Sequence, residues 1–329
     1  MDITKVQAYD DIWFDCKGNL YLSILQTIDR KYRNIALNND YYYRNRLVET
    51  SSGEHTILET FTRWDIVGEM FANKVDVKYE NDEQFMKEIK RLLDERKYVF
   101  VGVDLYYWIK ENLCHGRDHW YHSTLIQKYD KDEDLFYVFD VNMDKTYGIF
   151  TIDSDSFLTS VKKGMEGGIN TKWCEINLDV KIQDITRDML LENTFERLNN
   201  LKEVKKSYYW KMEEIEYKKH AYEDLNSVHL GRIVQRLQAN NMLFKELRNR
   251  GIIKGENSER IIGYTEELAN DWLMIRYKVN MLYVQTNLDQ KIKIINDRVQ
   301  ELFDKEMYVW DKFREELEEL DNITIFKFN

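Results

Sequence analysis

Three residue types that can perform acyl chemistry occur in a suggestive order along the first half of the chain. Cys16 directly precedes a stretch with apolar residues at helical spacing, His122 opens a predicted strand, and Asp140 ends the next one. A thiolate is a strong nucleophile, and the N-terminus of a helix and a nearby imidazolium both favour its formation. A histidine that moves the proton and an acid that orients the imidazole would complete a triad. The pattern therefore indicates acyl transfer or hydrolysis through a cysteine.

A predicted hairpin selects His122 and Asp140 as partners. Two strand-like runs flank an acidic segment centred near Asp132, which is typical of a turn between antiparallel strands. With that centre, His122 lies opposite position 142, and Asp140 is one diagonal step away on the same face. A register slip of one residue would separate the two side chains. We therefore predict a Cys16–His122–Asp140 triad, with Asn142 as an alternative orienting residue.

Each of these residues also has a structural interpretation. A cysteine before a helix often only packs, a histidine in an aromatic stretch is often hydrogen-bonded, and a strand-end acid is often a cap. Cys114, His115, His119 and His122 lie within nine residues and could ligate zinc, although their spacing matches no standard finger. Cys174 is expected to be a buried packing residue. The sequence contains no glycine-rich nucleotide-binding motif, so a nucleotide cofactor is not expected.

Composition restricts the partners. The chain has 329 residues, which is enough for two domains, and its net charge of −11 disfavours nucleic acid and anionic membranes as partners. That charge is compatible with a cationic amine or polyamine, although it can also serve solubility alone. The sequence shows no apolar run of membrane-spanning length and no signal segment, so we expect a soluble, cytoplasmic protein. Three cysteines form no even disulfide framework.

The character of the sequence changes near position 180, and we predict an α+β protein of two domains. Residues 1–180 mix helical and strand-like patterns, including a helix that begins at Asn81 and an irregular stretch over 38–45. Residues 181–329 follow a helical pattern rich in Glu, Lys and Leu. They predict a bundle or lid of three or four helices. The expected breaks lie near Asn226, within 251–257 and at Gly263.

Segments around the candidate residues resemble a known family. The runs VGVDLYY from Val101, HSTLIQKYD from His122 and FYVFD from Phe136 are similar to the N-terminal domain of the butirosin-biosynthesis acyltransferase family. The resemblance covers roughly residues 10 to 150. Two positions depart from the family pattern, with Lys128 in place of a glycine and Val141 in place of a proline. Neither position carries the reacting groups.

The resemblance implies a papain-like cysteine-protease fold in which Cys16, His122 and Asp140 form the catalytic triad. It also implies amide formation in specialised-metabolite biosynthesis, with an acyl group taken from the phosphopantetheine thioester of an acyl or peptidyl carrier protein. A small amine or polyamine would accept the acyl group, and no other cofactor is needed. The alternatives are a peptidase, amidase or thioesterase that uses water, and a binding protein without catalytic activity. The oligomeric state is left open.

Four further residues are predicted as substrate contacts. Asp104 could bind a cationic acceptor amine, as could the nearby Glu111. His119 lies close to the candidate base, and Gln7 is a candidate donor for the oxyanion. Gln7 precedes Cys16 by nine residues, which is further than the related peptidases place their glutamine. The backbone N–H of Cys16 at the helix start can supply one donor without it.

Overall fold

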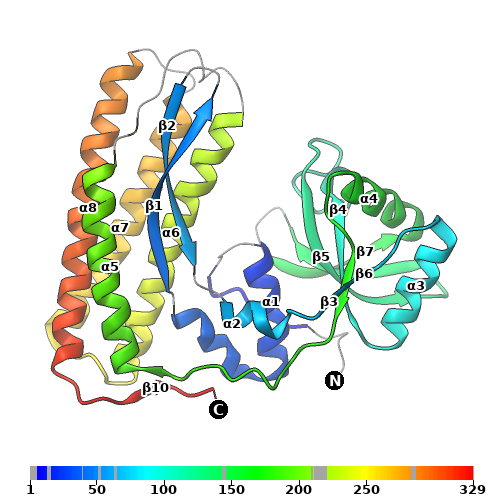
Figure 1. Cartoon of the computed structure of the whole chain (residues 1–329), viewed down its shortest axis with the longest axis horizontal. Helices are drawn as coiled ribbons and strands as arrows, with labels where there is room; N and C mark the ends of the chain where they lie inside the picture. The colour runs from blue at the N-terminus through cyan, green and yellow to red at the C-terminus, as the bar shows by residue number, and fades with distance from the viewer. Residues whose placement is uncertain are drawn as a thin grey trace. The chain divides into compact units, whose positions relative to one another are not determined.

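The chain forms two compact units of mixed α and β structure (Figure 1). The first contains residues 1–33 and 64–182, and the second contains residues 34–63 and 183–327. The computed structural model describes residues 6–12, 16–38, 40–50, 53–62, 65–142, 146–208, 210, 221–282 and 287–328. All three residues of the predicted triad fall within the first unit.

The first unit is built on a six-stranded antiparallel sheet with strand order β3-β8-β4-β5-β6-β7. The central strand β4 is a short apolar run that is buried along nearly its whole length, as expected for a strand covered on both faces. The strands are β3 (Lys74–Asp76), β8 (Lys172–Cys174), β4 (Tyr98–Asp104), β5 (Tyr121–Asp130), β6 (Leu135–Val141) and β7 (Tyr147–Asp153).

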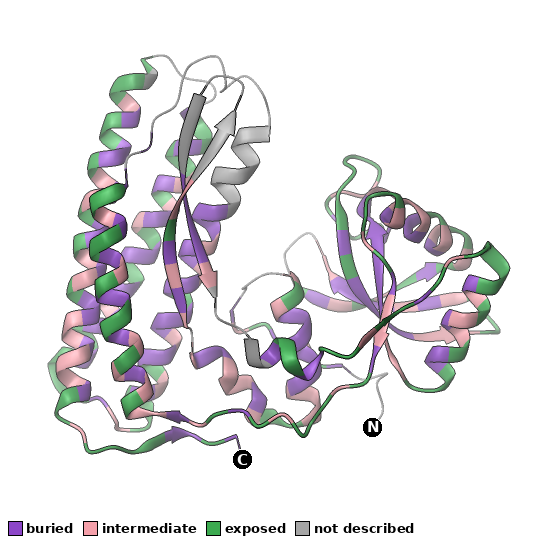
Figure 2. Ribbon diagram, in the orientation of Figure 1, coloured by how far each residue is buried: buried purple, intermediate pink, exposed green. Residues whose placement is uncertain are grey.

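Helices cover both faces of this sheet (Figure 2). Alternate β4 residues such as Val101 join the core beneath α3 and α4, whereas Phe100 faces the other way and contacts Tyr21 of α1. The helix predicted to begin at Asn81 is confirmed, because the Asn81 side chain caps the first turn of α3. The helices of this unit are α1 (Cys16–Ile28), α2 (Asp65–Met70), α3 (Asp82–Asp94), α4 (Ser154–Glu166) and the 3₁₀ turn η3 (Leu105–Tyr107).

The hairpin of β5 and β6 contains an irregularity that the sequence did not reveal. Its turn comprises residues 131–134, so its centre lies half a residue beyond Asp132. The pairing then shifts by one residue between Ile126 and Lys128, which leaves Gln127 as a bulge. The two departures compensate each other. As a result, the candidate histidine and acid still share one face of the sheet.

The second unit contains four long helices within the described part of the chain: α5 (Arg187–Ser207), α6 (Ala221–Asn249), α7 (Gly255–Leu282) and α8 (Leu288–Glu318). The predicted break within 251–257 is confirmed by the α6–α7 junction. The predicted breaks at Asn226 and Gly263 are wrong, since α6 and α7 run through these positions. A single glycine is tolerated in a helix whose neighbours pack well. No described helix combines the length and apolarity needed to cross a membrane.

A β-hairpin within the first third of the sequence belongs to the helical unit. The strands β1 (Tyr41–Thr50) and β2 (Gly53–Thr62) replace the irregular stretch predicted over 38–45. Tyr43 exchanges two backbone hydrogen bonds with the Asn200 amide of α5, and its hydroxyl donates to Glu306 of α8 at 2.7 Å. The division therefore differs from the predicted 1–180 and 181–329. These long-range contacts leave no local pattern in the sequence.

The remaining elements are short. The 3₁₀ helix η2 (Arg30–Asn38) precedes the hairpin, and β9 (Ile185–Thr186) pairs antiparallel with β10 (Thr324–Phe326). The latter pair joins the start of α5 to the segment that follows α8.

Candidate active site

Cys16 is the first residue of α1, and its main chain is held by buried polar contacts. The Asn19 amide donates to the carbonyls of Tyr9 at 3.2 Å and Ile12 at 2.7 Å, which ties these two residues to the first turn of α1. The Tyr147 hydroxyl of β7 donates to the Cys16 carbonyl at 2.7 Å. The half-buried thiol of Cys16 therefore lies at a helix N-terminus whose first N–H groups have no partner within the helix.

His122 and Asp140 form a buried hydrogen-bonded pair. His122 Nε2 lies 2.9 Å from Asp140 Oδ1, and the side chains are 6% and 0% exposed. The Trp108 indole N–H donates to the second carboxylate oxygen at 2.6 Å, and the Val141 backbone N–H donates to Oδ1 at 2.7 Å. Three donors thus fix the carboxylate, and the carboxylate in turn fixes the imidazole ring.

The Cys16 side chain is close enough to His122 to affect the pKa of the imidazole. Burial on its own lowers the pKa of His122, but Asp140 and Cys16 together outweigh burial and raise that pKa to about 10. Because Nε2 is committed to Asp140, Nδ1 is the ring nitrogen left to face the thiol. The site therefore favours an imidazolium next to the sulfur, which is the partner that a thiolate requires.

Trp108 is a site residue that sequence reasoning missed. It directly follows η3, is 2% exposed, and packs near Phe157 with ring centroids 6.0 Å apart. A buried indole needs an acceptor for its N–H, and a strand-end carboxylate is a suitable one. The sequence signal that could have revealed this contact was a tryptophan just after one strand of the sheet and an acid at the end of another strand.

The predicted substrate contacts Asp104 and His119 bind each other. Asp104 is buried, and its Oδ2 lies 2.7 Å from His119 Nδ1, while its Oδ1 accepts the Tyr106 backbone N–H at 3.1 Å. The His119 side chain is 54% exposed and stacks on the Tyr106 ring with centroids 4.5 Å apart. An acceptor amine could reach Asp104 only by displacing His119. Glu111 is exposed.

The prediction that Gln7 could serve the oxyanion is wrong, because the structure places this residue at the opposite end of α1. Its N–H donates to Thr27 Oγ1 at 2.8 Å, and its carbonyl accepts the Gln26 side chain at 2.9 Å. These partners lie ten or eleven residues after Cys16, a distance of about 15 Å along a helix. The backbone N–H of Cys16 at the start of α1 remains a candidate donor for the oxyanion.

The other residues considered from the sequence have separate structural roles. The Asn142 side chain accepts the Thr146 backbone N–H at 3.0 Å. In the described part of the chain, no group of three or more His, Cys, Asp or Glu side chains is arranged to hold a metal, the 114–122 segment included. Cys174 is fully buried as predicted, and burial above all raises its thiol pKa to about 11.

Comparisons with known proteins add no family to this geometry. No protein-family model matches the chain, and no curated protein matches its sequence.

Proposed function

We propose that this protein is a papain-like cysteine acyltransferase that forms amide bonds through a Cys16 acyl-enzyme. One observation carries the proposal: a half-buried cysteine at a helix N-terminus interacts with a buried histidine whose other nitrogen is held by Asp140. A six-stranded antiparallel sheet with the cysteine helix packed against it is compatible with a papain-like fold. This combination provides a nucleophile, an acid–base group and an orienting acid.

In the first half-reaction, the Cys16 thiolate attacks the carbonyl carbon of a thioester. The negative charge that develops on the oxygen is stabilised by first-turn N–H groups of α1. As the carbon–sulfur bond to the donor breaks, the His122 imidazolium gives its proton to the departing thiolate. A Cys16 thioester, a free donor thiol and a neutral imidazole remain.

In the second half-reaction, a neutral amine attacks the Cys16 thioester. His122 removes a proton from the attacking nitrogen, and the carbon–sulfur bond to Cys16 breaks. The products are an amide and the restored thiolate–imidazolium pair. A thioester is a higher-energy acyl donor than an amide, so the reaction needs no nucleotide. Asp140 keeps the ring oriented during both steps and stabilises its charged form.

The resemblance supplies the substrate classes. The donor is an acyl group on the phosphopantetheine arm of a carrier protein, and the acceptor is a small amine or diamine. The likeness extends to the amide-forming cysteine enzyme of closthioamide assembly, which joins a carrier-bound acyl chain to a diamine. The same site would act as a thioesterase or amidase if water replaced the amine.

Intact mass measured after mixing the protein with an acyl-pantetheine thioester tests the proposal. We expect one added acyl group in the wild type and in Cys114→Ala, and none in Cys16→Ala. Cys114 is a matched control because it is another half-buried cysteine of the same unit. Adding a diamine should then release an amide. Free acid at every amine concentration would instead indicate a hydrolase, and an unmodified Cys16 would indicate a binding protein.

A further inference from the structure

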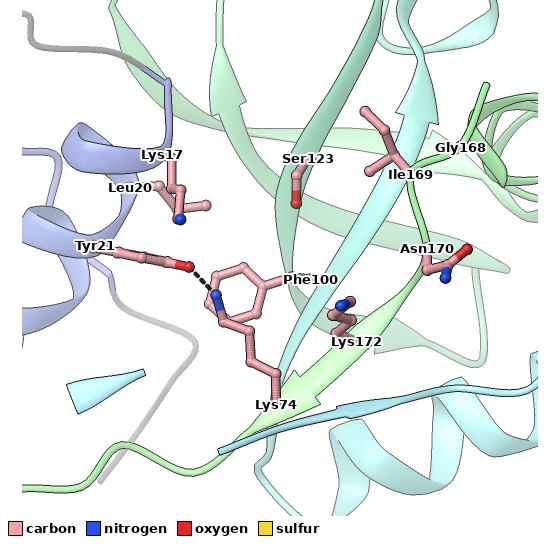
Figure 3. Close-up of a pocket in the computed structure, with 10 residues that line it drawn as sticks. All are labelled: Lys17, Leu20, Tyr21, Lys74, Phe100, Ser123, Gly168, Ile169, Asn170 and Lys172. Carbon is pink, nitrogen blue, oxygen red and sulfur yellow. Dashed lines mark hydrogen bonds between the residues drawn. The ribbon is translucent and has the colours of Figure 1, made fainter. Parts of the chain in front are cut away.

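An open pocket of about 360 Å³ lies between α1 and the sheet, in the same unit as the candidate active site (Figure 3). Lys17, which follows Cys16 in α1, contributes to its wall, and so does Ser123, which follows His122 in β5. The pocket thus shares two short segments of chain with the reacting groups. A molecule bound in it would contact the first turn of α1, which begins at Cys16.

Three lysines from three different elements line this pocket. Lys17 extends from α1, Lys74 from β3 and Lys172 from β8, and no acidic side chain is among the lining residues that the structure describes. Lys172 lies 3.4 Å from Asp76. The Lys74 amine hydrogen-bonds to the Tyr21 hydroxyl. Among the residues that the structure describes, no carboxylate forms an ion pair with Lys17 or Lys74.

This concentration of positive charge occurs in a chain whose net charge is −11. Burial is the main cause that lowers the pKa of Lys74, and the charges of Lys17 and Lys172 lower it further. Like charges held close together destabilise one another unless an anion lies between them. A bound anion would remove this repulsion.

The wall of the pocket is closely packed and carries neutral donors. The segment 168–170 lies against β4 so tightly that a Cβ at Gly102 would collide with the main chain of Ile169. Asn170 and Ser123 line the same space. An oxyanion can therefore receive hydrogen bonds from neutral groups as well as from ammonium groups.

We propose that this lysine pocket binds an anionic group of the substrate, a phosphate or a carboxylate, while the reactive carbonyl of the same molecule lies at Cys16. The choice of Cys16 as the reacting end rests on the proposed function. The pocket would repel a cationic amine, so the acceptor amine must approach Cys16 by another side. The anion could be the phosphate of the donor arm or a carboxylate on the acyl chain.

Calorimetry with matched ligand pairs tests the pocket without requiring turnover. The full chain carrying Cys16→Ala is titrated with 4′-phosphopantetheine and with pantetheine, which differ only by the phosphate. It is also titrated with glutarate and with glutaramide, which differ by their carboxylates. The same titrations are repeated with Lys74→Gln, Lys17→Gln and Lys87→Gln added. Lys87 is an exposed lysine of α3 in the same unit, so its variant makes the same change in charge away from the pocket.

We expect the anionic member of one pair to bind more tightly than its neutral partner. Lys74→Gln or Lys17→Gln should weaken that ligand about tenfold, and Lys87→Gln should leave it unchanged. Preference within the first pair identifies a phosphate site, and preference within the second identifies a carboxylate site. Equal binding within both pairs, or an equal loss in Lys87→Gln, would overturn the proposal. Because Cys16 is absent throughout, the result does not depend on whether the wild type transfers acyl groups.

Discussion

Two histidines that are three residues apart, His119 just before β5 and His122 within it, each pair with an aspartate. The two pairs differ in their surroundings. In both, one imidazole nitrogen lies within 3 Å of a buried carboxylate, at 2.9 Å for His122–Asp140 and 2.7 Å for His119–Asp104. The His122 side chain is 6% exposed and the His119 side chain is 54% exposed. Hydrogen bonding between His and Asp alone therefore does not distinguish a catalytic pair from a structural one.

The remaining neighbours separate the two pairs. Asp140 also accepts the Trp108 indole N–H and the Val141 backbone N–H, and Cys16 helps to raise the pKa of His122. His119 instead stacks on Tyr106, whose N–H binds Asp104, so that pair secures the turn that follows β4. A histidine–aspartate pair gains a chemical role when the free side of the imidazole meets a nucleophile. We predict that the two pairs respond differently to matched substitutions.

The largest difference is expected between His122→Ala and His119→Ala. The first removes the only histidine that interacts with the thiol in the described structure, and acid–base groups contribute about 10² to 10⁴ in rate. We expect acyl transfer to fall about 10³-fold in His122→Ala and less than about threefold in His119→Ala. Steady-state rates with an acyl-pantetheine and an amine measure both. Equal losses in the two variants would show that the two histidine–aspartate pairs do not differ in their role.

The next difference concerns the two acids. Asp140→Asn keeps the shape of the side chain but brings an NH₂ group against His122 and the Val141 N–H, or against the Trp108 N–H, so at least one hydrogen bond is lost. We expect transfer to fall about 10²-fold and stability to fall by about 1–3 kcal/mol. Asp104→Asn should reduce stability but change the rate less than about threefold, because the thiol does not interact with that pair. Rates together with urea unfolding separate the two effects, and a rate loss in Asp104→Asn as large as in Asp140→Asn would contradict the comparison.

A third prediction concerns pH. Burial lowers the pKa of His122, yet Asp140 and Cys16 raise it to about 10 overall. The folded pKa exceeds the ordinary value of about 6.5, so the pair stabilises the fold fully below that pH and loses this contribution as pH rises through about 10. Asp140→Asn should lower the pKa of His122, and its deficit in stability should be larger at pH 6 than above pH 10.

Ring-carbon NMR shifts of His122 and unfolding free energies measured across that pH range check this prediction. Asp104→Asn is the matched control, because it removes one carboxylate from the neighbouring pair and should leave the His122 titration in place. A His122 titration that is unmoved in Asp140→Asn would show that the carboxylate does not stabilise the imidazolium.

The sequence was informative about these pairs only in part. The spacing of His122 and Asp140 predicted a shared face, and the structure places them in contact. That success depended on a turn displaced by half a residue and a bulge at Gln127, which cancel each other. A bulge leaves one residue unpaired and gives no clear signal in composition, so the position of the turn could not reveal it.

Other features depend on contacts between distant segments. The role of Trp108 requires knowing that the turn after β4 meets the end of β6, which are 32 residues apart. Gln7 appeared suitable because of its short separation from Cys16, but its backbone binds the far end of α1. The hairpin strand that begins at Tyr41 joins helices more than 150 residues later. Local patterns predicted the elements, and tertiary contacts decided which elements meet.

The smallest predicted effect on the rate tests whether Trp108 belongs to the His122 pair. Trp108→Phe keeps an aromatic ring in the core but removes the N–H that binds Asp140 Oδ2 at 2.6 Å. We expect transfer to fall about tenfold and stability to fall by about 2–3 kcal/mol, since a buried hydrogen bond to a charged group is lost. Tyr106→Leu is the matched control, because it removes the ring that supports His119. If Trp108→Phe lowers stability but leaves the rate and the pKa of His122 unchanged, Trp108 only fills the core. If the transfer rate and the pKa of His122 both fall in Trp108→Phe while Tyr106→Leu changes neither, the indole positions Asp140. The difference between the two pairs then extends to the groups that hold each carboxylate.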